Sequence, residues 1–332
     1  YFIGAGCSLA GGLPDWRGML IKLARSSGIS EMDLISLSTL SYLDQAKVIE
    51  RRLADKYREE GIEQEHSQAT ALQHEISNLL NTSYHSMTHS LLANIPVDAI
   101  VTTNYDTMFE DACVGAQQSI YALPYEIRTS NSKWVLKLHG DINHPEDIVL
   151  TREQVDRYDD RRKALSGIVQ ALLITKHMLF VGFSLQDENF HKVASTMRTA
   201  FNPEGKSLDP EASKRRRFGT VLSLQNRPFL KELWPDLNMI PMDSVGYTMS
   251  QSEAARILEI FLDRVSLEAS TCSGHLLDQN FWGPSLSSEE WALKMEVERF
   301  MSAISDNELA KKAPGFEHIL EMIEKLGGNR EL

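Results

Sequence analysis

Asn104 and His139 have side chains that could carry chemistry, because each lies in a polar motif directly after an apolar stretch. Asn104 lies in residues 102–106 (TTNYD), and His139 lies in residues 138–141 (LHGD). An Asn amide can position a water molecule, and a His can take a proton near neutral pH. The stretches before them, 98–101 and 134–138, are typical of buried strands. The two side chains therefore indicate acid–base chemistry at strand ends.

A glycine-containing turn follows a third apolar stretch, at the start of the chain. Residues 4–8 (GAGCS) come directly after Phe2 and Ile3. Gly4 and Gly6 permit a tight turn and a close approach of the backbone to a phosphate. Ser8 and a helix starting after it could offer N–H donors to a pyrophosphate. The two glycines alone fit a simple tight turn equally well, because the third Gly of the dinucleotide fingerprint is not at its usual spacing.

A second flexible loop, residues 11–18 (GGLPDWRG), brings together an aromatic ring, a carboxylate and a guanidinium. Trp16 could cover a nicotinamide ring, and Arg17 could hold a phosphate or carboxylate through two hydrogen bonds. In the alternative interpretation, Asp15 is a helix N-cap and Trp16 anchors the core. A cap and a site loop are compatible, so both interpretations stay open.

A fourth segment completes the pattern. Residues 181–184 (VGFS) follow an apolar strand-like run, and Asp187 follows them. In a doubly wound α/β sheet, the carboxyl ends of the strands form the ligand crevice. The four segments therefore predict one nucleotide site in an α/β fold, with a Rossmann-like doubly wound parallel sheet, a helical insert and a C-terminal helical extension.

Together the four motifs, with residues 4–8 and 11–18 counted as one, resemble those of the sirtuin (silent information regulator two) family over residues 1–245. Its pattern is Gly-Ala-Gly-x-Ser, Gly-Ile-Pro-Asp-Phe-Arg, Thr-Gln-Asn-x-Asp, His-Gly and Gly-Thr-Ser. This chain departs from it at Leu13, Trp16, Thr103 and Phe183. The resemblance implies that Asn104 and His139 are catalytic and that Asp106 lies near the nicotinamide ribose. It also implies a set of NAD-binding residues: Gly4, Ala5, Gly6, Ser8, Asp15, Trp16, Arg17, Asp106, Gly182 and Ser184.

The reaction that the resemblance implies suits these residue types. Cleavage of a nicotinamide–ribose bond passes through an oxocarbenium-like sugar, and the leaving group is already cationic. It needs no acid, so the enzyme must orient the bond, shield the cation and place an acceptor. Asn104 could position water or polarise ribose hydroxyls, and His139 could take a proton from ribose or water.

The cysteines indicate which branch of the family the chain resembles. Deacylases of the family carry four zinc-binding cysteines in two Cys-x-x-Cys pairs, whereas this chain has only Cys7, Cys113 and Cys272. Three scattered cysteines cannot build that site, so we expect no metal. Zinc-less bacterial relatives with a helical insert resemble antiphage-defence effectors that hydrolyse NAD. We therefore expect an NAD hydrolase that releases nicotinamide and ADP-ribose.

Three alternatives stay open at this point. A non-catalytic adaptor could sense NAD or a related nucleotide through the same site, although it would not need both Asn104 and His139. A zinc-less NAD-dependent protein deacylase would need a rebuilt peptide groove. An NAD-dependent transferase acting on protein or nucleotide is the third.

Apolar patterning predicts three regions. Residues 1–30 and 81–245 form the NAD-binding catalytic domain, 31–80 a helical insert, and 246–332 a C-terminal helical region. The stretch 50–65 is charged and favours a solvated helix face over an oligomer contact. The Ser- and Gly-rich stretch 268–288 resembles a linker. The insert and the tail both carry apolar stripes, which an amphipathic helix must bury on its own core or on a neighbour. We therefore expect a homo-oligomer.

The composition of the chain indicates which classes of binding partner to expect. The formal charge is −12 and the isoelectric point about 5.4, so direct nucleic-acid binding is not expected, despite the basic run at 214–217. No apolar stretch reaches membrane-spanning length, and scarce cysteine without a signal peptide favours the cytoplasm. The resemblance implies a HerA-type ATPase or another defence partner. The chain starts at Tyr1 without a Met, so we expect preceding residues in the complete protein.

Overall fold

The computed structural model describes residues 1–61, 69–126, 132–201, 217–243, 249–269, 276–277, 283–305 and 307–328. Most of the basic run at 214–217 and Cys272 lie outside these ranges. The chain divides into two compact units, Tyr1–Glu268 and Ala269–Leu332. We expected the C-terminal region to start at 246, but the helix that follows this position belongs to the first unit.

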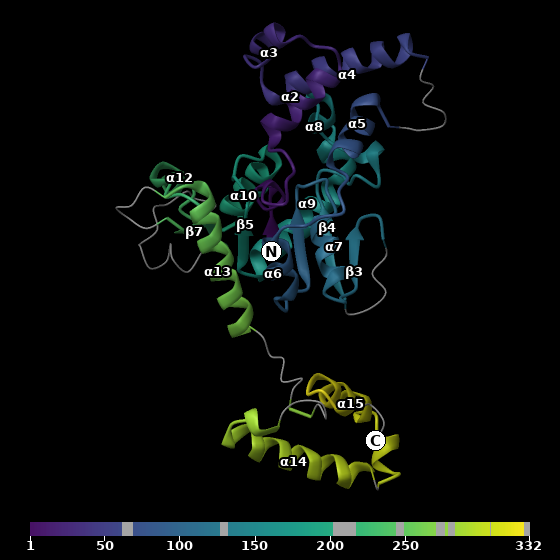
Figure 1. Cartoon of the computed structure of the whole chain (residues 1–332), viewed down its shortest axis with the longest axis vertical. Coiled ribbons are helices and arrows are strands. Elements are labelled where there is room, and N and C mark those ends of the chain that lie inside the picture. Colours follow the sequence, from purple (N-terminus) through teal and green to yellow (C-terminus); the bar gives the residue numbers. More distant parts are fainter. Residues whose placement is uncertain are drawn as a thin grey trace. The chain divides into compact units, whose positions relative to one another are not determined.

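A seven-stranded sheet with only parallel pairs forms the centre of the first unit (Figure 1). Its strand order is β3-β4-β2-β1-β5-β6-β7. The strands are β1 (Phe2–Ile3), β2 (Ala99–Thr102), β3 (Ile120–Leu123), β4 (Lys133–Lys137), β5 (Met178–Val181), β6 (Gly219–Ser223) and β7 (Leu237–Pro241). The chain builds outward from β1 in one direction and then returns to β5 on its other side. This reversal is the switch point of a doubly wound sheet, so the predicted Rossmann-like fold is confirmed.

Both faces of the sheet are covered, as a parallel sheet requires. Helices α9 (Tyr158–Thr175) and α10 (Glu188–Phe201) pack with one face in a single core cluster. The strand residues of that cluster are Phe2, Val101, Leu136, Phe180 and Val221. Their neighbours along each strand point to the other face, because strand side chains alternate, and Ile3, Ile100, Val135 and Val181 are also buried. The four central strands, β4, β2, β1 and β5, thus carry buried side chains on both faces.

Further helices connect the strands of the first unit. They are α1 (Ala5–Leu9), α2 (Trp16–Ser26), α6 (Met87–Asn94), α7 (Met108–Gly115), α8 (Arg152–Asp156), α12 (Pro228–Leu233) and α13 (Gln251–Ala269). The sequence indicated most of these but not α12, whose six residues include a Pro at the start and bury no side chain. Such a short exposed helix leaves no apolar period in the sequence.

The expected insert contains α3 (Glu31–Leu37), α4 (Tyr42–Glu59) and α5 (Ala71–Leu80). Ser30, Ser41 and Thr70 cap their N-termini through side-chain hydrogen bonds. In Figure 1 these helices gather with α2 beyond the carboxyl ends of the strands. Their buried residues form a second core cluster with α2 and with loops that follow the strands. Most of the apolar stripe of the insert is therefore buried within the chain, which is the intramolecular alternative to an oligomer contact, whereas Leu40 is exposed.

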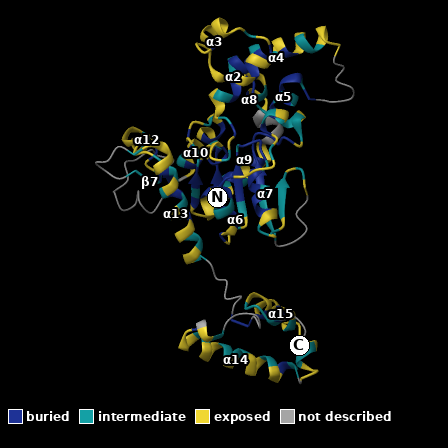
Figure 2. Cartoon of the chain, in the orientation of Figure 1, coloured by how far each residue is buried: buried dark blue, intermediate teal, exposed yellow. Residues whose placement is uncertain are grey.

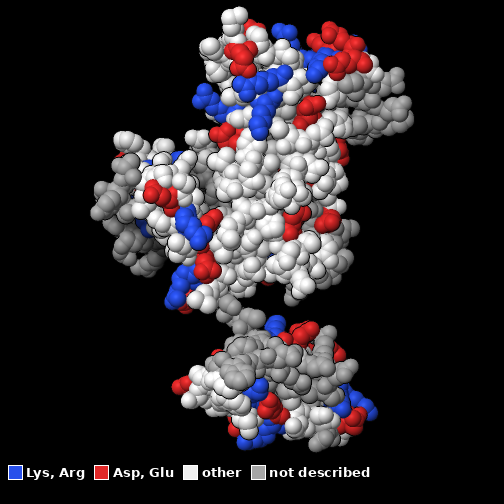
Figure 3. All heavy atoms as spheres, viewed as in Figure 1, with Lys and Arg blue, Asp and Glu red and all other residues white. Residues whose placement is uncertain are grey.

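The outer surface of the insert is charged. Figure 3 shows Lys, Arg, Asp and Glu side chains gathered over this end of the first unit, while the middle of the same face is mostly uncharged. On α4, Arg51, Arg52, Asp55, Arg58 and Glu59 are exposed. The described part of the charged stretch 50–65 is thus a solvated helix face, as favoured from the sequence.

The second unit contains α14 (Ser288–Ser305) and α15 (Phe316–Lys325). Leu277 lies in the stretch expected to be a linker, yet it is buried and its amide donates to the Leu326 carbonyl at 2.8 Å. Part of that stretch therefore packs in the second unit. Figure 2 shows that α14 carries many exposed residues, and these include Trp291, Leu293, Met295 and Phe300.

The described residues show neither a metal-binding cluster nor a membrane-spanning helix. Within them, no cluster of three or more His, Cys, Asp or Glu side chains is arranged to hold a metal ion. Across the same residues, every helix is too short or too polar to cross a bilayer.

Candidate functional site

The ends of β1 and β5 pack together at the switch point of the sheet. The Gly6 amide donates to the Gly182 carbonyl at 2.9 Å. A Cβ on Gly4 would lie 2.5 Å from that carbonyl oxygen, and one on Gly182 would lie 2.6 Å from the Cys7 nitrogen. Gly182 also has a φ of +65°. These glycines are required because the two strand ends approach each other, a reason additional to the phosphate approach inferred from the sequence.

The local structure after β1 differs from the expectation in one respect. We expected a helix to start after Ser8, but α1 starts at Ala5 with Gly4 as its N-cap, so Ser8 lies inside it. This position directs the buried Ser8 hydroxyl toward the end of β2 instead of making it a cap. Ala5 is half-buried and Gly6 is exposed at the start of α1.

Ser8 joins the two predicted site residues that follow β2. Its hydroxyl donates to Asp106 Oδ2 at 2.8 Å and accepts from Asn104 Nδ2 at 2.9 Å. All three residues are buried. The structure thus joins residues 4–8 and residues 102–106 through one hydrogen-bond network.

Asn104 has one polar atom that the protein leaves available. Its backbone amide donates to Thr102 Oγ1 at 3.0 Å, and its side-chain amide nitrogen is held by Ser8. Among the described residues, Asn104 Oδ1 is buried and has no hydrogen-bond partner. Buried polar atoms are nearly always paired, so this oxygen fits a substrate hydroxyl or a water molecule.

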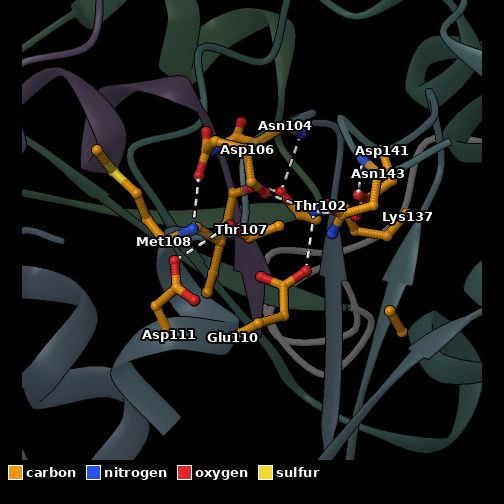
Figure 4. A network of polar contacts seen from close by, with 12 residues as sticks. Thr102, Asn104, Asp106, Thr107, Met108, Glu110, Asp111, Lys137, Asp141 and Asn143 are labelled. Atoms are coloured by element: carbon orange, nitrogen blue, oxygen red, sulfur yellow. Dashed lines mark hydrogen bonds and ion pairs between the residues drawn. The ribbon is translucent and has the colours of Figure 1, made fainter. Parts of the chain in front are cut away.

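A buried lysine fixes the loop that carries Asn104 and Asp106. Lys137, at the end of β4, is fully buried, and its Nζ donates to the Asp106 carbonyl at 2.5 Å. The same Nζ forms ion pairs with Glu110 at 2.9 Å and Asp141 at 3.0 Å. Figure 4 shows these side chains converging from the β2 loop, α7 and β4. Lys137 therefore ties together the segments on either side of the site.

The charges in this cluster support one another. Burial disfavours the lysine cation, but Glu110, Asp141 and Asp106 outweigh it and raise the pKa of Lys137. Burial raises the pKa of Glu110, while Lys137 opposes that shift. Asp106 Oδ1 also accepts the Met108 amide at 3.2 Å, at the start of α7. The site thus contains an ionised lysine and carboxylates held by fixed donors.

His139 follows Lys137 by two residues, and its ring lies against the carboxyl group of Asp187. Its Nε2 is 2.8 Å from Asp187 Oδ2, and only 7% of its side chain is exposed. Burial opposes ionisation of Asp187, yet His139 and the Phe190 and Asn189 amides lower the pKa of this carboxyl. Gly140, with a φ of +114°, follows His139, and a Cβ there would lie 2.6 Å from the Asp147 carbonyl. The segment that carries His139 therefore contacts the segment that follows β5 and carries Asp187.

The loop before α2 fits only part of the alternative interpretation, in which Asp15 is an N-cap and Trp16 anchors the core. Asp15 Oδ1 accepts the Gly18 amide at 2.7 Å, so Asp15 is an N-cap as that alternative required. Trp16 is 37% exposed, so the suggestion that it anchors the core is wrong. Its ring packs edge-on against the ring of Tyr105, the residue that follows Asn104, and the two ring centroids are 5.8 Å apart. Arg17 is exposed, as is Ser184 in the β5 loop.

Sequence reasoning missed Lys137 and Glu110 and gave Asp187 no role. A signal for Lys137 existed, because a lysine inside the apolar run 134–138 must either end the strand or be buried with a partner. Identifying Glu110 as that partner required knowing that β4 pairs with β2, with Lys137 beside Thr102.

Comparisons with known proteins agree with this geometry. Residues 98–218, which include Asn104, His139 and Asp187, match the family model described as "SIR2-like domain". The chain is 26% identical over 306 residues to "NAD(+) hydrolase ThsA" of Bacillus cereus (strain MSX-D12), covering 85% of this chain and 57% of that protein. It is 29% identical over 209 residues to the protein of the same name from Enterococcus faecium, covering 59% of this chain and 39% of that protein.

A further similar protein, matched over a shorter stretch, has a name that also refers to sirtuins. The chain is 27% identical over 105 residues to "Defense-associated sirtuin 2" of Bacillus subtilis, covering 30% of this chain and 10% of that protein. The chain thus spans about half or less of the length of these curated relatives.

Proposed function

We propose that the chain hydrolyses NAD to nicotinamide and ADP-ribose, because residues 98–218 match the SIR2-like domain model. One observation carries the proposal: the expected site residues follow the carboxyl ends of β4, β2, β1 and β5, which are neighbouring strands of the sheet. Ser8, Asn104 and Asp106 form one hydrogen-bonded chain, and His139 pairs with Asp187. Such strand ends beside a switch point are where doubly wound sheets bind nucleotides.

The proposed chemistry uses the groups that the site makes available. As the nicotinamide–ribose bond breaks, its electron pair leaves with nicotinamide, which departs neutral. The ribose becomes oxocarbenium-like, and the carboxylate of Asp106 supplies negative charge in a buried setting. Asn104 Oδ1 accepts a hydrogen bond from water or from a ribose hydroxyl. The water oxygen bonds to the ribose carbon while His139 takes the proton.

The biological role that we propose is NAD depletion in antiphage defence. The names of the relatives, NAD(+) hydrolase and defence-associated sirtuin, support it. An NAD hydrolase that is always active would be toxic to the cell that makes it, so we expect activity to depend on assembly. A homo-oligomer through α14, or a complex with a HerA-type ATPase or another defence partner, would supply that control.

An assay with purified protein and NAD tests the activity directly. Nicotinamide and ADP-ribose are quantified with and without an acetylated peptide, and in parallel NAD is measured in cells that express the full-length protein. We expect both products without peptide and loss of cellular NAD. Asn104→Ala is the matched inactive control. Release of nicotinamide only with peptide would indicate a deacylase, and binding of NAD without cleavage in either setting would indicate an adaptor.

A further inference from the structure

We propose that Asp187 is a positioning residue that fixes the proton on His139 Nε2 and so selects the tautomer of this imidazole. The catalytic consequence rests on the proposed function, whereas the placement of the proton does not. Nothing in the relatives' names or in the motif resemblance assigns this role to Asp187.

The two carboxylate oxygens of Asp187 have separate partners. Oδ1 accepts the Phe190 amide at 2.7 Å and caps the start of α10. Oδ2 lies 2.8 Å from His139 Nε2. An ionised carboxylate can only accept hydrogen bonds, so the imidazole nitrogen that faces it must carry a proton. In the neutral ring the lone pair then lies on Nδ1.

The loop between β5 and α10 is held in one shape that delivers Asp187 to His139. Leu185 in this loop has a φ of +61°, a conformation that is rare for a residue with a branched side chain. Leu185 is buried in the main core cluster, and its carbonyl accepts from His191 Nε2 at 2.8 Å. Strained backbone persists where the surroundings over-determine it, and it concentrates at functional sites. The core and His191 thus maintain the conformation that places Asp187.

Replacement by asparagine separates positioning from helix capping. Asn has one acceptor oxygen where Asp has two. If that oxygen keeps the α10 cap, the amide NH₂ faces His139 Nε2, which must then be the unprotonated nitrogen. Asp187→Asn should therefore preserve the fold and the cap while reversing the tautomer of His139. In a Ser-His-Asp triad the same kind of substitution leaves the geometry intact but produces the wrong tautomer.

Nitrogen NMR of histidine-labelled protein at pH 8 reads the tautomer without any activity, and a His139→Gln spectrum assigns the signals. We expect His139 to carry its proton on Nε2 in the wild type and on Nδ1 in Asp187→Asn. Asp15→Asn alters another helix cap, and it should leave the His139 signals unchanged. A wild-type Nδ1–H tautomer, an imidazolium at pH 8, or an unchanged tautomer in Asp187→Asn would each overturn the proposal.

Kinetics then test the consequence. Asp187→Asn should lower kcat by about 10²-fold or more, with KM little changed, because the tautomer of His139 would be reversed. Asp187→Glu, which keeps both acceptor oxygens, should recover part of the loss. A rise in kcat for Asp187→Asn would mean that the pair blocks His139, and it would refute positioning. A wild type with the expected tautomer but no NAD cleavage would refute the proposed function alone.

Discussion

Ser8 and Asp106 are hydrogen-bonded at 2.8 Å although 98 residues separate them in the chain. The bond closes the site between β1 and β2, because Ser8 follows the first strand and Asp106 follows the second. It also leaves Ser8 able to accept from Asn104. The hydroxyl therefore sets the orientation of the amide whose buried oxygen has no partner among the described residues. Ser8, which we expect to contact pyrophosphate, also orients the proposed catalytic amide.

Substitution of the two proposed catalytic residues should separate turnover from binding. We expect Asn104→Ala and His139→Ala each to reduce NAD cleavage by about 10²-fold or more, the usual scale for losing a positioned acid–base group. NAD binding measured by calorimetry should persist, because phosphate contacts would come from residues 4–8. His318→Ala, on the exposed face of α15, is the control. Near wild-type turnover for either variant would remove that residue from the mechanism.

Loss of Lys137 should destabilise the fold strongly. Lys137→Met leaves Glu110 and Asp141 buried without their cation, and breaking a buried pair in this way costs about 3–5 kcal/mol. Urea unfolding of the first unit measures the change in the free energy of unfolding. Lys176→Met, at an exposed position, should change it little.

A second substitution shows whether the charge causes the effect. Adding Glu110→Gln to Lys137→Met removes one of the stranded carboxylates and should recover part of the loss. If the double variant is as unstable as the sum of the two single variants, packing rather than electrostatics holds this cluster.

The switch point should not tolerate a side chain at Gly182. Gly182→Ala places a Cβ 2.6 Å from the Cys7 nitrogen at a φ of +65°, so overpacking and backbone strain add. We expect a loss of about 2 kcal/mol or more in the free energy of unfolding. Gly167→Ala, inside α9 with nothing near the added atom, should instead stabilise the protein by roughly 0.5–1 kcal/mol. Equal effects of the two substitutions on thermal unfolding would contradict the role assigned to Gly182.

The Asp187–His139 pair should give a specific pH dependence of stability. The pKa of Asp187 is lowered in the folded protein, so the unfolded state binds more protons as the solution becomes acidic. Its stabilisation is therefore present above its ordinary pKa of about 3.9 and is lost as pH falls through the lower folded value. The difference in unfolding free energy between wild type and Asp187→Asn should shrink below about pH 4. A difference that stays constant from pH 7 to pH 3 would show that the carboxylate charge does not contribute.

The sequence predicted those features that depend on local pattern. The apolar run 178–181 corresponds to β5 residue for residue, and the amphipathic spacing in the insert corresponds to helices that bury one stripe. What the sequence could not predict depends on pairing across the sheet. Lys137 meets Glu110 only because β4 lies beside β2, and Gly4 meets Gly182 only because β5 lies beside β1. The positive φ of Leu185 is likewise imposed by tertiary packing, since nothing in its local sequence requires it.

Assembly should depend on the second unit rather than on the insert. Most of the stripe of the insert is buried within the chain, although Met32, Ile35 and Leu40 are exposed. Helix α14 exposes Trp291, Leu293, Met295 and Phe300. Exposed apolar side chains gathered on one helix indicate an interaction surface. Truncation after residue 270 should therefore lower the assembly state in light scattering, while unit Tyr1–Glu268 stays folded by circular dichroism.

A paired substitution in the full-length chain tests the surface without truncation. Trp291→Glu with Phe300→Glu should reduce the oligomer, because burying the new charges at an interface costs free energy. Met32→Glu, on the exposed side of α3, is the control and should leave assembly unchanged. A full-length chain that is monomeric at micromolar concentrations with NAD present would contradict the oligomer, and dissociation by Met32→Glu alone would move the interface to the insert.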